Sequence, residues 1–519
     1  ELRETVALAG PESAALAALL ADLHLHAAKE DDVLFPAAAG LENGEEAEEN
    51  LREDWNEPPA PMLDDGRLLR QTRGRCGTCL ADVPAALHSR KGAVYLDRDC
   101  PTHGRSSQLI SRAAADWAEL DRYYFTVNAD DRPQRDYIVR MTERCNLACP
   151  ICLAKANTED TPDLDLSGLE KLLSERRGIK IDLMAAEPTL RPDLEDWVRR
   201  VKASGNVAAL HTNGLKLANA DYCHRMKVAG VEEVFLQFDG LDDEANKTLR
   251  GRPLLQARQA ALKNLRAEGI ATSLIVVVGK GINEAQVSET FRYALRPEND
   301  HIREVFFLGL RGLGSARYTG NFGEQSLMPD EILDLLCAQE PGIRRRDVVD
   351  FNKLYFAMLS ALKVKKCLYV QHYLVLRGGP HGYLPISEVL DMPALGKAAD
   401  RYAARYAEHP AMAKAGLAAA LVKQGLRPAA LRHAVDLVAL EQLLARGMNL
   451  DRVPPKMLLL GFITACDPDN FDAAVAVNCG KGELSADGGF VESGAVANVE
   501  RERRFAESAR KPGRALASP

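Results

Sequence analysis

The chain has 519 residues, a formal net charge of −8 at pH 7 and a pI near 5.9. This length exceeds what one compact core usually holds, so about three or four units are expected. No segment is dominated by Lys and Arg, which argues against nucleic acid as a partner. The 11 cysteines follow no regular framework, and no apolar run approaches the ~20 residues of a membrane span. These features favour a reducing, cytoplasmic location.

Residues 1–60 are predicted to form a helical extension followed by an acidic linker. Apolar residues recur at helical spacing in AALAALLADLHLHAA, whereas GEEAEENLREDWNEPPAP is charged and contains prolines. His26 and Glu30 lie four residues apart near His24, in a stretch that resembles one piece of a hemerythrin-type four-helix bundle. A di-iron site needs ligands from several helices. A degenerate bundle fragment or a plain extension is therefore favoured, and metal binding by these residues is left open.

Residues 61–130 contain two knuckles that are typical of a metal site. Cys76-Gly-Thr-Cys79 and Cys100-Pro-Thr-His103 have the spacings C-x2-C and C-x2-H, as in a zinc ribbon or rubredoxin-like module. Four such ligands would close around one tetrahedral ion and leave no position for a substrate, so a structural role is predicted. Zinc is the first choice and mononuclear iron the second. A ribbon that has lost its metal is the other interpretation.

The sequence YIVRMTERCNLACPIC (137–152) carries three further cysteines directly after an apolar strand. Cys145, Cys149 and Cys152 can hold three irons of a [4Fe–4S] cube and leave the fourth iron without a protein ligand. An open coordination position is typical of catalytic sites. A zinc loop or three buried thiols is the alternative interpretation.

The C-x3-C-x2-C spacing after a strand resembles the cluster loop of the radical S-adenosylmethionine (radical SAM) superfamily. That resemblance implies that S-adenosylmethionine (SAM) binds the open iron. It also implies reductive cleavage of SAM to a 5′-deoxyadenosyl radical, with electrons from a ferredoxin or flavodoxin.

Apolar strands and amphipathic helices alternate over residues 131–345, as in parallel β/α units. The predicted strands are 137–141, 179–185, 207–212, 231–238, 271–278 and 302–310. The resemblance implies an α/β fold with a partial (β/α)6 barrel of the TIM type. Functional residues of such barrels lie at the C-terminal ends of the strands.

Ala185-Ala186-Glu187-Pro188 stands where the family has Gly-Gly-Glu-Pro. In the family, this backbone and the glutamate receive the amino group of SAM, so Ala185, Ala186 and Glu187 are predicted cofactor-binding residues. Alanine in place of both glycines would obstruct a positive-φ conformation. The departure puts the geometry of cofactor binding in doubt.

The resemblance implies further cofactor-binding residues at the following strand ends. Asn213 in His211-Thr212-Asn213-Gly214 would reach the cofactor, and Gln237 and Asp239 end the fourth strand. Asp239 is expected to bind ribose hydroxyls or an incoming substrate, whereas Gly279 and Ile151 are expected to border the adenine. Each position also has a backbone explanation, because strand-to-helix turns favour Gly, Asn and Asp.

Residues 346–519 are rich in Ala and Leu and are predicted to form a mostly helical cap or substrate domain with a frayed tail. An auxiliary Fe–S cluster is one interpretation of the cysteines in and near this region. Because they form no C-x2-C pair, buried structural thiols are favoured. These cysteines are Cys337, Cys367, Cys466 and Cys479.

Over about residues 68–315, the order of motifs is similar to an archaeal-type branch that includes tetraether lipid synthases and pterin-methylating radical SAM enzymes. We expect an enzyme that abstracts hydrogen from an unactivated carbon, leading to C–C bond formation or alkylation of a lipid or small metabolite. A pterin-type radical methyltransferase is the alternative, and a non-catalytic cluster-binding regulatory protein is the alternative of another class. Peripheral membrane contact is left open. A long apolar tunnel would favour a lipid, and a small polar pocket would favour a pterin.

Overall fold

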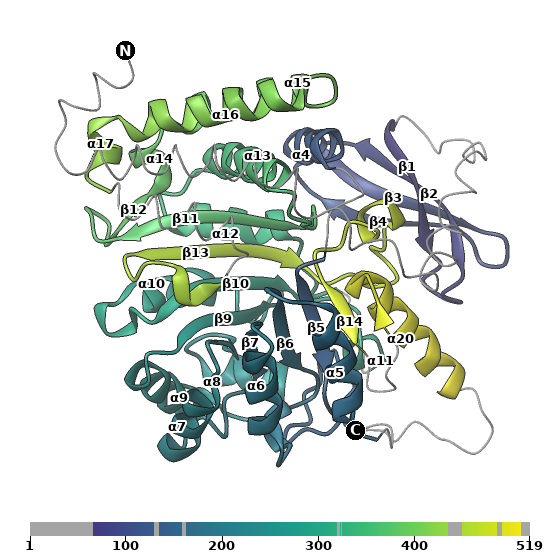
Figure 1. The fold of residues 1–519 in the computed structure, drawn as a ribbon. Helices are drawn as coiled ribbons and strands as arrows, with labels where there is room; N and C mark the ends of the chain where they lie inside the picture. Colours follow the sequence, from purple (N-terminus) through teal and green to yellow (C-terminus); the bar gives the residue numbers. More distant parts are fainter. Residues whose placement is uncertain are drawn as a thin grey trace.

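A computed structural model describes residues 66–128, 134–157, 162–318, 322, 324–433, 449–484 and 490–509 (Figure 1). The N-terminal stretch with His24, His26 and Glu30 lies outside the described residues.

The metal-ribbon segment is a four-stranded antiparallel sheet in the order β1-β2-β3-β4. Its strands are β1 (Arg67–Arg75), β2 (Asp82–Arg90), β3 (Ala93–Cys100) and β4 (Gly104–Ser111). The two knuckles occupy the β1–β2 and β3–β4 turns, which places them at the same end of the sheet. Helix α4 (Ala114–Val127) then leads from this sheet toward the barrel.

Six parallel strands in sequence order confirm the predicted partial barrel. Two of them, β7 and β9, have the predicted bounds. The strands are β5 (Asp136–Arg140), β6 (Lys180–Met184), β7 (Val207–Thr212), β8 (Glu233–Gln237), β9 (Ala271–Val278) and β10 (Ile302–Gly309). The helices between them are α5 (Leu166–Glu175), α6 (Leu194–Ala203), α7 (Ala220–Ala229), α8 (Asp243–Arg250), α9 (Leu255–Ala267) and α10 (Gln286–Leu295).

Local capping explains where several barrel helices begin and end. The side chain of Asn219 accepts a hydrogen bond from Tyr222 N at the start of α7, and Asp242 does the same for Glu244 N at the start of α8. Both helices end at a glycine with left-handed backbone, Gly230 after α7 and Gly251 after α8.

The C-terminal region adds strands to both edges of the barrel sheet. β13 (Met457–Thr464) runs parallel to β10, and β11 (Val370–Arg377) and β12 (Tyr383–Pro385) extend that edge. β14 (Gly482–Leu484) runs parallel to β5 at the opposite edge and pairs with β15 (Phe490–Val491). The full order is β12-β11-β13-β10-β9-β8-β7-β6-β5-β14-β15.

Helices make up most of the rest of the described chain after β10, and the C-terminal region is mostly helical, as predicted. They are α11 (Ser315–Tyr318), α12 (Pro329–Gln339), α13 (Arg345–Ala361), α14 (Ile386–Val389), α15 (Met392–Tyr406), α16 (Pro410–Gly425), α17 (Pro428–Leu431), α19 (Ala473–Ala476) and α20 (Gly494–Ala509). Strand β13 was not predicted, because a short apolar run such as MLLLGFIT cannot be distinguished from a buried helix by periodicity. Among the described helices, none has the length and apolarity that crossing a bilayer requires.

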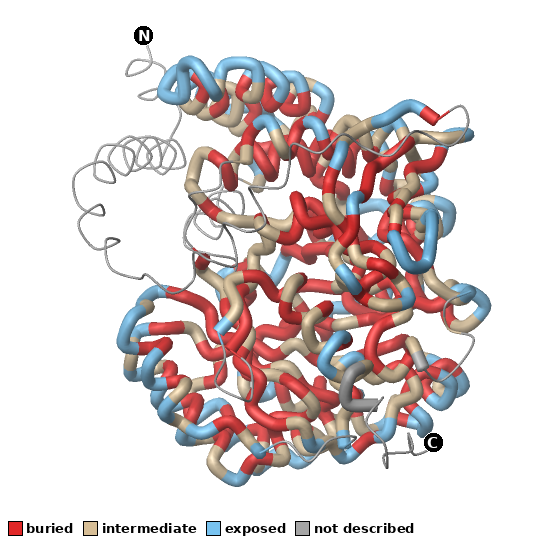
Figure 2. The backbone as a smooth tube through the Cα atoms, turned by 90° about the vertical axis from the view of Figure 1, so that its right-hand side faces the viewer, coloured by how far each residue is buried: buried red, intermediate tan, exposed pale blue. Residues whose placement is uncertain are grey.

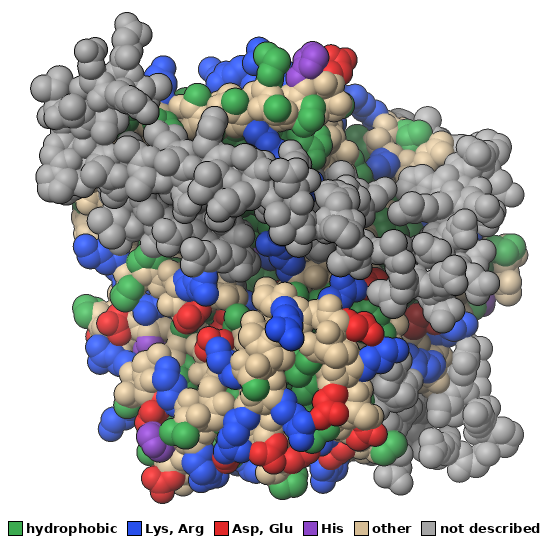
Figure 3. Space-filling model, in the orientation of Figure 1, with side chains coloured by type: hydrophobic (Ala, Val, Ile, Leu, Met, Phe, Trp, Pro, Cys, Tyr) green, Lys and Arg blue, Asp and Glu red, His purple; other side chains and the backbone are tan. Residues whose placement is uncertain are grey.

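Buried residues follow the long sheet, while exposed residues gather on the outer helices and loops (Figure 2). On the face drawn in Figure 3, acidic and basic side chains are intermixed over the barrel helices. Side chains that point into the barrel differ in chemistry from those that point outward, toward the helices. Ile181 and Leu183 of β6 belong to the apolar core, whereas Lys180 and Asp182 alternate with them and face other strands across the barrel interior.

Candidate active site and metal centre

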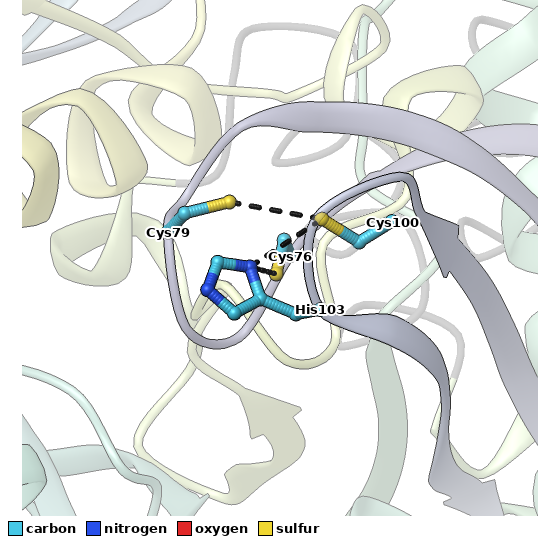
Figure 4. A group of neighbouring side chains, drawn as sticks. All are labelled: Cys76, Cys79, Cys100 and His103. Atoms are coloured by element: carbon cyan, nitrogen blue, oxygen red, sulfur yellow. Dashed lines mark hydrogen bonds between the residues drawn. The ribbon is translucent and has the colours of Figure 1, made fainter.

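The four predicted ribbon ligands meet at one point (Figure 4). Their donor atoms all lie within 4.8 Å of one another. Sγ of Cys79 is 3.8 Å from Sγ of Cys100, and Nδ1 of His103 is 3.6 Å from Sγ of Cys76 and 3.5 Å from Sγ of Cys100. Ligands about 2.3 Å from a tetrahedral centre are about 3.7 Å apart, so this set fits a zinc ion or a single iron.

The first knuckle also favours the metal-binding form of its cysteine. Thr78 N donates a hydrogen bond to Sγ of Cys76, at 3.4 Å. Burial raises the pKa of this thiol, but the N–H groups of Cys79 and Thr78 outweigh it and lower the pKa to about 6. The thiolate is the form that binds metal.

Replacing Cys76 and Cys79 together by serine is expected to remove one equivalent of zinc or iron per chain. The ribbon should then exchange its amide hydrogens faster over residues 67–111, because the described apolar cluster at the metal site contains only Val83 besides the cysteines. Elemental analysis and hydrogen exchange measure both effects. Cys223→Ala, in the barrel helix α7, is the matched control, and equal metal content in the two variants would contradict the assignment.

The ribbon is anchored to the barrel next to its metal ligands. Arg98 Nη1 donates to Arg75 O and Pro468 O, both at 3.0 Å, and forms an ion pair with Asp469 at 3.2 Å. Arg317 of α11 pairs with the same Asp469 at 3.2 Å and donates to Gly77 O in the first knuckle. The metal site is therefore connected to the segment that follows β10.

The three cysteines of the second motif follow β5 at the C-terminal end of the parallel sheet, as predicted. Leu147 N donates to Sγ of Cys145 at 3.3 Å, and Ala156 N donates to Sγ of Cys152 at 3.4 Å. All three cysteines are half-buried. The loop thus presents sulfur atoms supported by backbone N–H groups, which is the donor set that an Fe–S cluster requires.

Burial, together with the charges of Glu187, Cys149 and Cys152, raises the pKa of the Cys145 thiol to about 12. The pKa of Cys149 is also raised by burial, although Arg250 opposes the shift. These thiols would remain protonated at neutral pH without a cation. Iron binding would supply that charge and release the protons.

The cluster loop is fixed by contacts from three directions. Asn157 returns to Cys145, accepting from its N at 3.0 Å and donating to its O at 3.1 Å. Ser315 N donates to Cys152 O at 2.8 Å, and Gly314 lies so close that a Cβ would be 2.7 Å from Cα of Leu153. Gly314 also has φ of 63°, so glycine is required there twice over.

Helix α20 of the C-terminal region secures the same loop. Lys155 Nζ forms an ion pair with Glu502 at 3.0 Å, and the other oxygen of Glu502 accepts from Gly314 N at 2.8 Å. Both partners of the ion pair are buried. The C-terminal region is therefore part of the framework of the cluster loop.

Ala185 and Ala186 both adopt positive φ, at 76° and 29°. The expectation that alanine would obstruct this conformation is wrong for the backbone, which keeps the shape that glycine would give. Non-glycine residues in this region carry about 1–2 kcal/mol of strain each. Glu187 N donates to Arg144 O at 3.0 Å, and this bond ties the strained turn to the cluster loop.

Ala185→Gly is expected to increase the free energy of unfolding by about 0.5–1 kcal/mol, because relief of strain exceeds the added unfolded-state entropy of glycine. Urea unfolding measures the change. The control is Ala209→Gly in β7, a buried strand residue without positive φ, which should be destabilising. A loss of stability in both variants would contradict the strain at residue 185.

Glu187 is fully buried, and both of its carboxylate oxygens have donors. One oxygen accepts from Thr189 N at 3.2 Å and from the hydroxyls of Thr189 and Thr212 at 2.7 Å each, and the other accepts from Asn213 N at 2.8 Å. Burial raises the pKa of Glu187, although these donors oppose the shift. The carboxylate therefore joins the ends of β6 and β7, and contact of Glu187 and of the preceding turn with the cofactor stays a prediction.

Asn213 lies directly over the cluster loop. Its Nδ2 donates to Asn146 Oδ1 at 2.7 Å and lies 3.9 Å from Sγ of Cys145. Sequence reasoning did not single out Asn146. Asn213 therefore lies beside the cluster loop, and its contact with the cofactor stays a prediction.

Asp239 lies in a buried ion pair, not at a free surface. Its carboxylate accepts from Arg250 Nε at 2.7 Å, from Arg250 Nη2 at 2.8 Å and from Val277 N at 3.1 Å, and Arg258 Nη1 is 3.4 Å away. Gln237 accepts from the same Arg258 at 2.9 Å. Because these oxygens are occupied, this geometry does not support direct ribose binding by Asp239. The contacts of Asp239 instead favour a role in positioning Arg250 beside Cys149.

Ile151 and Gly279 border one small apolar cluster behind the cluster loop. Ile151 packs with Leu249, Val277 and Leu310. A Cβ on Gly279 would be 2.8 Å from Cδ1 of Ile282 and 3.2 Å from Cδ2 of Leu310, so a larger residue there would have to displace these side chains. The two predicted adenine-bordering residues therefore lie against the same apolar surface, and their contact with a nucleobase stays a prediction.

Of the four cysteines considered for an auxiliary cluster, three converge and one stands apart. Cys466 and Cys479 pack against the same apolar cluster around Phe471, and the backbone of Gly480 adjoins Cys367. Cys337 lies in α12 among Asp334, Arg345 and Asp347. An auxiliary Fe–S cluster stays a prediction, and Cys337 is not placed with the other three.

Residues 139–294 match the family model of the Radical SAM superfamily. They form a radical SAM domain. Residues 68–112 match the HMPTM N-terminal zinc ribbon domain, in agreement with the four-ligand site. The radical SAM domain implies a [4Fe–4S] cluster and SAM as cofactors, and the donor set on the cluster loop fits them.

Curated relatives match parts of the chain. A 7,8-dihydro-6-hydroxymethylpterin dimethyltransferase of Methanocaldococcus jannaschii is 27% identical over 294 residues, covering 51% of this chain and 56% of the relative. A probable GTP 3′,8-cyclase of Pyrococcus horikoshii is 27% identical over 166 residues, covering 31% and 53%. The chain thus spans about half the length of these relatives. Among solved structures, Streptococcus suis SuiB bound to S-adenosylmethionine has a TM-score of 0.34 at 15% identity, covering 40% of this chain and 48% of SuiB.

Sequence reasoning missed the charged interior of the radical SAM barrel. Lys180 pairs with Glu233 at 2.9 Å, and Asp182 pairs with His211 at 3.2 Å and with Lys481. The signal was present in the strand IKIDLM, where the charged residues Lys180 and Asp182 are two positions apart. Buried parallel strands are ordinarily near-continuous apolar runs, so charges with period two indicated a polar lumen.

Proposed function

We propose that the chain is a radical SAM enzyme that alkylates a small polar heterocycle of the pterin type. The observation that carries the proposal is the positive-φ turn at Ala185-Ala186. It keeps a glycine-like backbone beside the cluster loop and tied to it, despite the cost of strain. A barrel that had lost SAM binding would have no evident reason to hold this conformation. The non-catalytic alternative is therefore less favoured.

When bound, the [4Fe–4S] cluster and SAM supply an organic radical that can abstract hydrogen from an unactivated carbon. The chain's own residues prepare the site for that chemistry. The turn at 185–187 offers backbone groups to the cofactor, Glu187 holds that turn against β7, and Asn213 covers Cys145. Arg250 lies beside Cys149 and favours its thiolate. The apolar wall at Ile151 excludes water from one side.

The charged lumen supports the polar substrate class over the lipid class. Lys180 pairs with Glu233, and Asp182 pairs with His211 and Lys481, so charged groups line the lumen, and an acyl chain offers such a lining no hydrogen bonds. A polar metabolite does. The name of the Methanocaldococcus jannaschii relative, a pterin dimethyltransferase, supports the same choice.

The remaining finer assignments belong to this proposal. A ferredoxin or flavodoxin would supply the electron, as the radical SAM domain requires a reductant. A reducing cytoplasm would suit a chain whose cysteines serve as metal ligands.

The test is anaerobic reconstitution with iron and sulfide, followed by dithionite reduction with SAM present. Formation of 5′-deoxyadenosine, measured by mass spectrometry, is the expected result. An intact cluster that yields none, even with a reduced pterin added, would overturn the proposal.

A further inference from the structure

Two adjacent rows of inward-facing side chains form one wall of the barrel lumen. The first row crosses β7, β8, β9 and β10 through neighbours in register, which are His211, Phe235, Ser273 and Glu304. The second row consists of Gln237, Ile275 and Phe306, and all three are half-buried. Because these inward residues keep partial exposure, the described side chains do not fill the lumen at this level.

Aromatic rings line this wall beside the polar groups. The rings of His211 and Phe235 stack with centroids 4.3 Å apart. Phe306 is admitted by Gly461 of β13, where any Cβ would collide with the phenyl ring. His372 lies opposite Gly461 in register, with its ring centroid 6.2 Å from that of Phe306. The wall is suited to a planar ligand.

Most charged groups of the lumen neutralise one another. Lys180 pairs with Glu233 at 2.9 Å, and Lys481 pairs with Asp136 at 3.1 Å and with Asp182. His211 completes this network through Asp182, at 3.2 Å.

Among the charged groups of the lumen named here, Glu304 and Lys366 differ from the others because neither has a described ion-pair partner. Glu304 is 4% exposed and accepts one bond from the Ser273 hydroxyl at 2.7 Å, and no described basic group lies within ion-pair distance of it. Lys366 likewise has no described carboxylate within 4.0 Å, although its amine faces Asp136 and Glu304 at longer range. Burial raises the pKa of Glu304. The two groups therefore border the same space without closing it.

We propose that Glu304 and Lys366 orient the substrate, with Glu304 accepting from the N–H edge of a planar heterocycle and Lys366 donating to its carbonyl oxygen. A 2-amino-4-oxo ring of the pterin type carries both features on one flat skeleton. Its faces would lie against Phe235 and Phe306, and its N–H groups would satisfy the carboxylate that Ser273 satisfies only in part. This inference rests on the proposed function and names the residues that select the substrate.

Equilibrium binding of 6-hydroxymethylpterin, followed by its own fluorescence, tests the inference without turnover. The full-length, reconstituted protein should bind it, and Glu304→Gln and Lys366→Met should each weaken binding about tenfold or more, since each leaves a buried polar group of the complex unpaired. Glu304→Gln retains the bond to Ser273, so the barrel should fold. Glu170→Gln and Lys247→Met, on exposed barrel helices, are the matched controls and should bind as the wild type does.

A second readout separates this inference from the proposed function. SAM cleavage by dithionite without substrate should be equal in the wild type and all four variants, because the described hydrogen bonds of the Glu304 side chain and the Lys366 carbonyl go to Ser273 and Tyr124 and not to the cluster loop. No pterin binding by the wild type, or equal binding by all variants, would overturn the inference even if SAM is cleaved. Pterin binding that is lost in the two variants would support it even if no 5′-deoxyadenosine forms. Binding of phospholipid vesicles in place of the pterin would also overturn it.

Discussion

Cys149→Ala is expected to abolish formation of 5′-deoxyadenosine, with a loss of at least about 100-fold, since even outer-shell partners of a metal contribute 10–100-fold. Cys149 is the middle ligand of the loop, and Arg250 lies beside its sulfur. Its removal would leave two thiols for a cube that needs three protein ligands. Iron, sulfide and the absorption of the reconstituted protein near 400 nm report the cluster, and mass spectrometry reports the product.

The matched control is Cys223→Ala, which removes a buried thiol from α7 and should leave both iron content and SAM cleavage unchanged. Undiminished cleavage in Cys149→Ala would contradict the assignment of the loop. The reconstituted Cys149→Ala variant also tests for an auxiliary Fe–S cluster. Iron and sulfide retained beyond the single metal of the ribbon would lie at Cys367, Cys466 and Cys479, where three thiols converge.

The parts of the fold that local pattern determines could be predicted from the sequence. The six barrel strands are short apolar runs separated by amphipathic helices, and each one was found, two with their predicted ends. The ribbon was equally predictable, because C-x2-C and C-x2-H knuckles at the turns of a small sheet bring four donors together whatever the rest of the chain does. Sites of this kind can be predicted from the local spacing of their ligands.

Long-range pairing could not be predicted in this way. Asp239 pairs with Arg250, which lies eleven residues later in the chain. The buried environment of Asp239 also depends on Arg258 and on Val277 of the next strand. Strand β14 has three residues and becomes a strand only because β5 offers an edge. Lys366 reaches the lumen from the C-terminal region. Contacts of this kind depend on the assembled sheet and leave little trace in a short window of sequence.

The backbone at Ala185-Ala186 shows a limit of reasoning from residue types. Alanine argues against positive φ, yet the turn is held there by bonds from Glu187 to Arg144, Thr189 and Asn213. Tertiary contacts supply enough free energy to impose a conformation that costs about 1–2 kcal/mol per residue. Conserving the shape of the turn therefore does not require conserving glycine.

Asp239→Asn is expected to lower the free energy of unfolding by about 3–5 kcal/mol, because removing one partner of a buried ion pair leaves an uncompensated charge. Asp239 is fully buried between Arg250 and Arg258, which are themselves buried. The pKa of Arg258 is already lowered to about 10, by burial and by repulsion from Arg250, although Asp239 opposes the shift. Asparagine would leave two buried guanidinium groups beside each other without their carboxylate.

Urea unfolding of the variant and of Asp196→Asn distinguishes this effect from ordinary loss of a charge. Asp196 forms an exposed ion pair with Arg199, so its replacement should cost less than about 1 kcal/mol. Asp239→Asn combined with Arg258→Gln should recover part of the loss, since one of the two uncompensated charges is then removed. Equal stability of the Asp239 and Asp196 variants would show that the pair contributes nothing.

The pH dependence of stability offers an independent view of the same pair. Burial opposes ionisation of Asp239, yet Arg250 and Arg258 hold its pKa below the usual range. A carboxyl group with a lowered folded-state pKa contributes stability that is present above its unfolded pKa of about 3.9 and is lost as the pH falls through the folded value. The wild type should therefore lose stability relative to Asp239→Asn only as the pH falls below about 4.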